Sequence, residues 1–191
     1  MNKLKKLSIP AFTLVELLVV LLIISILMSL LFSSASNARE SAGRAKCLAN
    51  LRTIGMAAAT YSSENKLYPA PPGFWQAFHD AGYIATNSQV WICPSDQRTN
   101  KKSTGVGPIS YAYNGRWSGL PPTYWATAKA ALLKIPKPTK TVYFCDANAY
   151  YMDQANKTAA FRHKGKINAL FYDGHVETLT FTNSNDFYNS L

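Results

Sequence analysis

The most constraining feature of this sequence is an apolar run near its beginning that contains one acidic residue. Residues 12–32 number 21, and only Thr13, Glu16, Ser25 and Ser29 among them are polar. As an α-helix the run would extend over roughly 31 Å, which matches the hydrocarbon core of a bilayer. A carboxylate facing lipid costs on the order of 3 kcal/mol at mid-bilayer, so the presence of Glu16 needs a physical explanation.

The residues before this run predict its orientation. Lys3, Lys5 and Lys6 precede it, so the N-terminus is expected in the cytoplasm and the rest of the chain across the membrane. A plain signal-anchor and a signal peptide cleaved near Ala35 are the alternatives. The apolar run is longer than the roughly 7–15 residues usual for a signal peptide, and neither alternative explains Glu16.

The chain from Ala11 into "FTLVELLVVLLIISIL" resembles the N-terminus of type IV prepilins and type II secretion pseudopilins. The resemblance implies that a prepilin peptidase cleaves between Ala11 and Phe12 and methylates the new amino group of Phe12. It also implies that Glu16 pairs with the N-terminal amine of a neighbouring subunit in a filament. A cation beside this carboxylate offsets the cost of its burial. The family usually has Gly before the cleavage site, where this chain has Ala11.

The helix is expected to continue beyond the membrane segment. Residues 33–65 contain no Pro and are rich in Ala, which favours a helix. Six positions within this segment share one helical face: Cys47, Leu51, Ile54, Gly55, Ala58 and Tyr61. Pro69 and the prolines after it end the helix. The pattern predicts one helix of about fifty residues whose second half is half-buried against a head.

The rest of the chain predicts a head built from short elements. We expect helices over 74–84, closed by Gly82, and over 124–135. Strands are expected over 89–93 and 139–147, and "ISYAYNG" alternates up to an Asn-Gly turn signal. Residues 166–181 predict a hairpin with a two-residue type I′ turn at Asp173-Gly174.

These elements define the expected fold class and domain organisation. The fold class is α+β, with a pilin-like long N-terminal helix packed on a small antiparallel sheet. The expected regions are a leader (1–11), a transmembrane and filament-core helix (12–32), an amphipathic extension of that helix (33–65) and a periplasmic or extracellular head (66–191).

Four further segments resemble a pseudopilin-related bacterial group. They are "CLANLRTIGMAAATYSSENKLYP" (47–69), "WICPSD" (91–96), "SYAYNG" (110–115) and "RHKGKINALFYDGHVE" (162–177). The group is marked by a His, nine residues and then Asp-Gly, and here His163 precedes Asp173-Gly174 at that spacing. The resemblance implies the fold and a filament more firmly than any secreted client.

His163, Asp173 and His175 also suggest a metal site, because imidazole and carboxylate are suitable ligands. In a hairpin, however, the turn lies at one end of the strands and His163 beyond the other end, roughly 33 Å away at 3.3 Å per residue. We therefore interpret His163, Asp173 and Gly174 as structural, with Asp173 and Gly174 forming the turn, and we expect no metal or other cofactor.

The three cysteines leave two arrangements open. The head is expected in an oxidising compartment, where disulfides form. One arrangement pairs Cys47 with Cys93 and leaves Cys145 as a buried thiol. The other has three buried free thiols, because spacing alone does not fix connectivity.

Two functions follow from these patterns. The first is a pseudopilin subunit of a type II secretion system or related type IV filament, held in the bacterial inner membrane and assembled with other pilin subunits. The second is a surface filament subunit whose head binds DNA or acidic polysaccharide, since the net charge is +10 and basic and aromatic side chains bind such polymers. Trp75, Trp91, Trp117 and Trp125 are the candidates for stacking. The sequence has no G-x-S-x-G, HExxH or Walker motif, so an enzyme is not expected.

Overall fold

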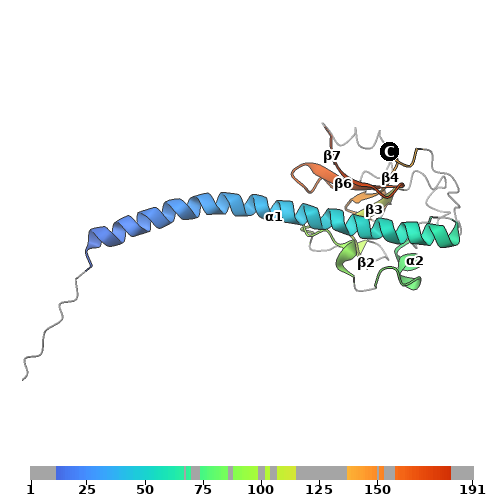
Figure 1. Ribbon diagram of the computed structural model, residues 1–191, viewed down its shortest axis with the longest axis horizontal. Helices are drawn as coiled ribbons and strands as arrows, with labels where there is room; N and C mark the ends of the chain where they lie inside the picture. The colour runs from blue at the N-terminus through green and yellow to red at the C-terminus, as the bar shows by residue number, and fades with distance from the viewer. Residues whose placement is uncertain are drawn as a thin grey trace, which may run out of the picture. The chain divides into compact units, whose positions relative to one another are not determined.

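The computed structural model describes residues 12–66, 68–69, 74–85, 88–98, 102–103, 107–114, 137–149, 151–152 and 158–181. The leader and the predicted helix over 124–135 lie outside these residues. The chain divides into two compact units, residues 1–39 and 40–191. A single helix, α1 (Leu14–Asn65), contributes to both units and has the length that the sequence predicts (Figure 1).

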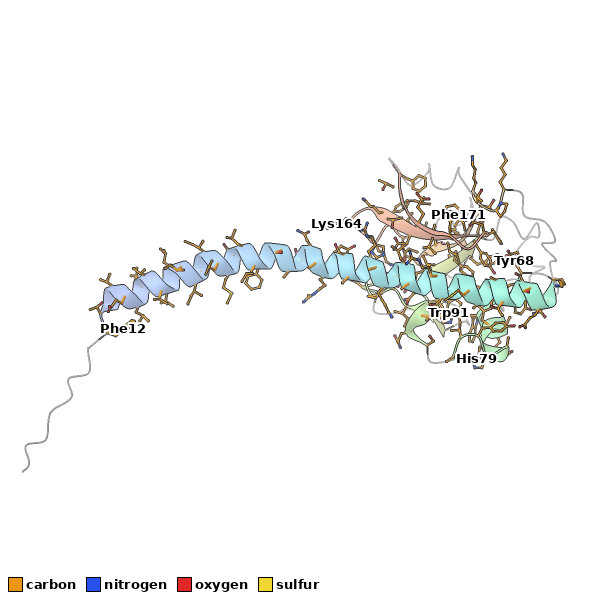
Figure 2. All side chains as sticks on the ribbon, viewed as in Figure 1. Phe12, Tyr68, His79, Trp91, Lys164 and Phe171 are labelled. Atoms are coloured by element: carbon orange, nitrogen blue, oxygen red, sulfur yellow. A yellow bond between two sulfur atoms is a disulfide. The ribbon has the colours of Figure 1, made fainter. Side chains whose placement is uncertain are left out.

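From Leu14 to Phe32, α1 is apolar on every side. The large apolar side chains from Phe12 to Phe32 are all exposed, each by 44% or more, and they project all around the helix (Figure 2). The hydroxyls of Ser25 and Ser29 donate to the carbonyls of Leu21 and Ile26, so these two polar groups are satisfied within the helix. By length and composition, this helix is apolar enough to cross a membrane.

The second unit contains a five-stranded sheet in the order β5-β3-β4-β6-β7. Four of its strands form antiparallel pairs, and β5 pairs in parallel with β3 through two residues. The fold is therefore α+β. The strands are β3 (Tyr111–Asn114), β4 (Val142–Asp146), β5 (Tyr151–Met152), β6 (Lys166–Phe171) and β7 (Val176–Thr180). A separate two-stranded ladder joins β1 (Lys102–Ser103) and β2 (Gly107–Pro108).

The second half of α1 packs on one face of this sheet through the predicted stripe. Cys47, Leu51 and Ile54 are fully buried in a core that they share with Leu170 of β6 and with side chains of β3 and β4. The approach is close at Gly55, where a Cβ would lie 2.8 Å from Leu170 Cδ1. The apolar pattern of the sequence therefore predicts the correct face of the helix.

A bulge in β4 enlarges the helix-facing side of the sheet. The register between β4 and β6 shifts between Val142 and Phe144, so that Tyr143 and Phe144 both enter the helix-side core. Val142 and Cys145 belong to the core on the opposite face. Because alternation resumes after Cys145, the next residue, Asp146, faces α1 again.

One local prediction beside the helix-side core is wrong. The segment predicted as a strand over 89–93 is a 3₁₀ helix, η1 (Gln89–Trp91), because Ser88 caps it by accepting the N–H of Val90. The predicted helix over 74–84 is present as α2 (Phe74–Asp80), although it ends earlier than predicted. Gly82 closes it as predicted, with a left-handed φ of +74° in the turn after α2.

The hairpin between β6 and β7 is present, but its loop is longer than predicted. The N–H of Phe171 donates to the carbonyl of His175, and the N–H of Gly174 donates to the carbonyl of Phe171. Three residues, 172–174, therefore lie between the hydrogen-bonded pair Phe171 and His175, instead of the two predicted. The left-handed position belongs to Gly174 alone, with φ +90°, as in a type I turn followed by a bulge.

Candidate functional site

The predicted processing and assembly residues lie at the start of α1. Ala11 is outside the described residues, and Phe12 is exposed. The N–H and Oγ1 of Thr13 donate to Glu16 Oε2 over 2.9 and 2.7 Å, and the N–H of Glu16 donates to Thr13 Oγ1 over 3.2 Å. This reciprocal pair is a capping box. Sequence reasoning missed this role of Glu16, although the T-x-x-E signature is present in "TLVE".

A group of sulfur-containing and ionisable side chains lies between α1 and the sheet. Cys47 comes from α1, Cys93 follows η1, Asp146 ends β4, and His163 precedes β6. All four are buried, and one ligand atom from each lies within 4.8 Å of the others. We call these four residues the Cys–Asp–His cluster.

The two cysteines of the cluster form a disulfide. Cys47 and Cys93 have Cα atoms 5.2 Å apart and are separated by 46 positions in the sequence. This is one of the two arrangements that the sequence left open. Cys145, the third cysteine, is a buried free thiol on the opposite face of the sheet, where its Sγ lies 3.1 Å from Met152 Sδ.

His163 lies between two carboxylates. Its Nδ1 is 3.1 Å from Glu40 Oε1, and its Nε2 is 3.4 Å from Asp146 Oδ2 and 3.6 Å from Cys93 Sγ. Burial by itself lowers the pKa of His163, but the hydrogen bonds and charges of Asp146 and Glu40 outweigh it, so that the pKa is raised. Both ring nitrogens therefore have defined neighbours, and the ring is fixed.

Asp146 is only partly satisfied. Its Oδ2 accepts the backbone N–H of Asn168 over 2.9 Å, whereas its Oδ1 is buried and has no hydrogen-bond partner among the described residues. A buried polar atom without a partner costs about 1–3 kcal/mol. No hydrogen bond from the described residues therefore compensates for the burial of Oδ1.

A second polar group surrounds Asp96, whose side chain is fully buried. Arg98 donates to both carboxylate oxygens, Ser110 Oγ donates to Oδ2 over 2.6 Å, and Arg162 Nη2 is 3.3 Å from Oδ2. Burial raises the pKa of Asp96, but the hydrogen bonds from Arg98 and Ser110 outweigh it and hold the pKa well below its usual range. Because Arg162 also donates to the carbonyls of Ser110 and Ala147, this network joins three segments of the head.

The structure separates His163 from Asp173 and His175, as the hairpin argument predicts. Asp173 Oδ1 accepts the N–H of His175 and lies 2.6 Å from its Nδ1 in the turn. His163 bridges to Lys166 at the other end of β6. Sequence reasoning did not group His163 with Asp146 or the cysteines. The one signal was a carboxylate at the end of the otherwise apolar strand "VYFCD".

The tryptophans predicted to stack on a polymer divide into two groups. Trp91 lies in the core, and Trp75 is partly buried against it. Trp117 and Trp125 lie outside the described residues.

Comparisons of the chain with protein-family models, with curated proteins and with solved structures found no match.

Proposed function

We propose that this chain is a pseudopilin: a pilin-like structural subunit of a type II secretion system or related type IV filament. The observation that supports it most is the first unit of α1, whose large apolar side chains from Phe12 to Phe32 are all exposed. Such a helix needs lipid or other apolar helices around it. A subunit that first lies in a bilayer and then packs into a filament is surrounded first by lipid and then by the apolar helices of its neighbours.

In this proposal, the N-terminus is cytoplasmic and the head periplasmic, on the bacterial inner membrane. A prepilin peptidase cleaves between Ala11 and Phe12 and methylates the amino group of Phe12, after which the chain joins other subunits. The role is structural and includes no catalysis. Mass spectrometry of the mature N-terminal peptide tests the processing step: we expect N-methylated Phe12, and an intact Met1 or a start near Ser36 would contradict it.

The capping box does not prevent an intermolecular role for Glu16. Both hydrogen bonds from Thr13 end at Oε2 of Glu16. The second carboxylate oxygen, Oε1, can therefore accept the N-terminal amine of a neighbouring subunit without loss of the cap. Because a charge-assisted bond is about twice as strong as a neutral one, this pairing depends on the charge of Glu16.

Two substitutions separate the cap from the charge. Glu16→Gln keeps a side chain that serves in a capping box but removes the charge, whereas Thr13→Ala removes the cap and keeps the charge. We expect the Glu16→Gln variant to insert in the membrane as fully as the wild type. The amount of this variant in filaments isolated by shearing should fall to a small part of the wild-type amount. Thr13→Ala should assemble near the wild-type amount. Glu177→Gln, the same chemical change at an exposed residue of β7, is the control. Normal filaments with Glu16→Gln would refute the assembly role.

The alternative function, binding of DNA or acidic polysaccharide, gains no support from the described residues. Trp91 is buried in the core, so its ring is not available to stack on a base or sugar. Arg98 is bound to Asp96 and to the carbonyls of Asn148 and Ile109. A structural subunit is therefore the single function that we propose.

A further inference from the structure

We propose that the head has a zinc site in its dithiol state: when the Cys47–Cys93 disulfide is open, the two thiolates bind one Zn²⁺ together with His163 and Asp146. This inference goes beyond the proposed function and does not depend on it. The disulfide and the metal are then alternative states of the same two sulfur atoms.

The first argument is the geometry of the donor atoms. Zinc takes four ligands in a tetrahedron, with Zn–S near 2.3 Å and Zn–N or Zn–O near 2.0–2.2 Å, which places the ligand atoms about 3.3–3.8 Å from one another. His163 Nε2 already lies 3.4 Å from Asp146 Oδ2 and 3.6 Å from Cys93 Sγ. All four donor atoms lie within 4.8 Å of one another. The two sulfurs have to move apart, and this becomes possible when their bond opens.

The second argument is the set of groups around these donors. A histidine that binds zinc commonly donates its other ring N–H to a carboxylate, which fixes the tautomer and the ring orientation. Here Glu40 Oε1 lies 3.1 Å from Nδ1 of His163, so Nε2 is the nitrogen directed at the cluster. The backbone N–H of Asn168 holds Asp146 in the same way through Oδ2.

The third argument is the unsatisfied oxygen of Asp146. Oδ1 is buried without a hydrogen-bond partner among the described residues, on a side chain with no exposed surface. A metal ion held by both oxygens of this carboxylate would give Oδ1 a partner, and Oδ2, the oxygen 3.4 Å from His163 Nε2, would keep its bond to Asn168. The thiolate and imidazole ligands favour zinc over the hard cations Mg²⁺ and Ca²⁺.

Interconversion of the two states is ordinary thiol–disulfide chemistry. In the zinc state, each cysteine has released its proton and binds as a thiolate. A disulfide oxidant accepts two electrons from these thiolates and two protons from the solvent and is reduced to its dithiol, the S–S bond of Cys47 and Cys93 forms, and Zn²⁺ leaves. The reverse reaction needs a thiol or phosphine reductant, and it restores both thiolates.

The test uses the full chain in detergent micelles, in one oxidised sample and one reduced with a phosphine. After incubation with Zn²⁺ and gel filtration, elemental analysis should find one zinc per reduced chain and none per oxidised chain. With Co²⁺ in place of Zn²⁺, the reduced chain should show the charge-transfer absorption of thiolate–cobalt bonds. A reduced chain without zinc, or an oxidised chain with as much zinc, would overturn the proposal.

Matched variants locate the site. Asp146→Asn and His163→Gln should each lower zinc affinity at least tenfold, and Glu40→Gln should lower it about 10–100-fold through His163. Asp173→Asn and His175→Gln make the same changes in the exposed His–Asp pair of the turn, and Cys145→Ser removes the thiol outside the cluster; all three should retain full binding. Equal affinity of His163→Gln and wild type would refute the assignment.

A measurement on the wild-type chain avoids any variant that fails to fold. Alkylation of the reduced chain, followed by peptide mapping, should show that zinc slows modification of Cys47 and Cys93 and that a chelator restores the rate. Cys145, which is buried outside the cluster, is the internal reference, and zinc should slow its modification less than that of Cys47 and Cys93. Equal rates at Cys47 and Cys93 with and without zinc would overturn the proposal.

Discussion

The two halves of α1 have opposite distributions of apolar side chains. From Leu14 to Phe32 the large apolar residues are exposed all around the helix. From Cys47 to Tyr61 the buried residues form one stripe, and Arg52 and Met56 on the other faces are exposed. A helix with one apolar stripe is satisfied by one partner, which here is the sheet of the same chain, whereas a helix that is apolar on all sides needs a surrounding apolar phase. Secondary structure alone therefore does not distinguish an anchor from a core helix.

The largest expected effect follows from removal of the Cys47–Cys93 disulfide, which links the second half of α1 to the rest of the head. A disulfide that closes a loop of this length stabilises a fold by about 4 kcal/mol in the chain-entropy description. We expect Cys47→Ser/Cys93→Ser to lower the free energy of unfolding by about that amount in metal-free buffer. Chemical denaturation of the full chain in micelles measures it. Cys145→Ser, which leaves the disulfide in place, is the control. An equal decrease in the free energy of unfolding in both variants would contradict the prediction.

The next effect compares one leucine from each half of α1. Leu51 is fully buried, whereas Leu22 is 58% exposed. Leu51→Ala leaves a cavity against the sheet and should lower the free energy of unfolding of the head by about 2–5 kcal/mol. Leu22→Ala should change it by less than about 0.5 kcal/mol, as surface substitutions do. If both variants unfold alike, the contrast between the two halves is wrong.

The parts that the sequence predicts well have a local physical cause. The apolar run, the stripe at helical spacing and the prolines after residue 68 together determine α1. Alternation and Gly174 predict β6 and β7. The strand predicted over 89–93 failed because a short apolar run fits a strand or a helical turn equally well, and the capping oxygen of Ser88 decided between them.

The Cys–Asp–His cluster could not be predicted in the same way. Its residues come from four separate segments of the chain, and Cys93 and His163 are 70 positions apart, so no local spacing connects them. The bulge in β4 sets which face Asp146 occupies, and a bulge leaves no clear signature in a single sequence. The T-x-x-E capping signature is local, but a charged Glu16 in an apolar run also fits an intermolecular role, so the sequence alone does not single out the cap.

A smaller effect is the loss of stability of the head at acidic pH. The pKa of Asp96 is lowered in the folded state, so the folded chain binds this proton less readily than the unfolded chain. The stabilisation by Asp96 is therefore complete above its unfolded pKa of about 3.9 and is lost as the pH falls toward the folded pKa. Denaturation between pH 5 and 2 should show a steeper loss of stability for the wild type than for Asp96→Asn, which lacks the charge that pairs with Arg98 and Arg162. Parallel curves would contradict this prediction.

The smallest effect is at the start of the apolar half. Thr13 and Glu16 satisfy N–H groups that the first turn of α1 leaves unpaired, and in lipid or detergent there is little water to replace them. Thr13→Ala should destabilise the first turn by about 1 kcal/mol, with faster amide hydrogen exchange at residues 14–17. Exchange in β4 and β6 should not change, because the head does not depend on this cap. A double-mutant cycle with Glu16→Ala gives the coupling directly. If the two single substitutions add without coupling, the cap does not form in micelles, and the charge of Glu16 then needs a partner outside its own chain.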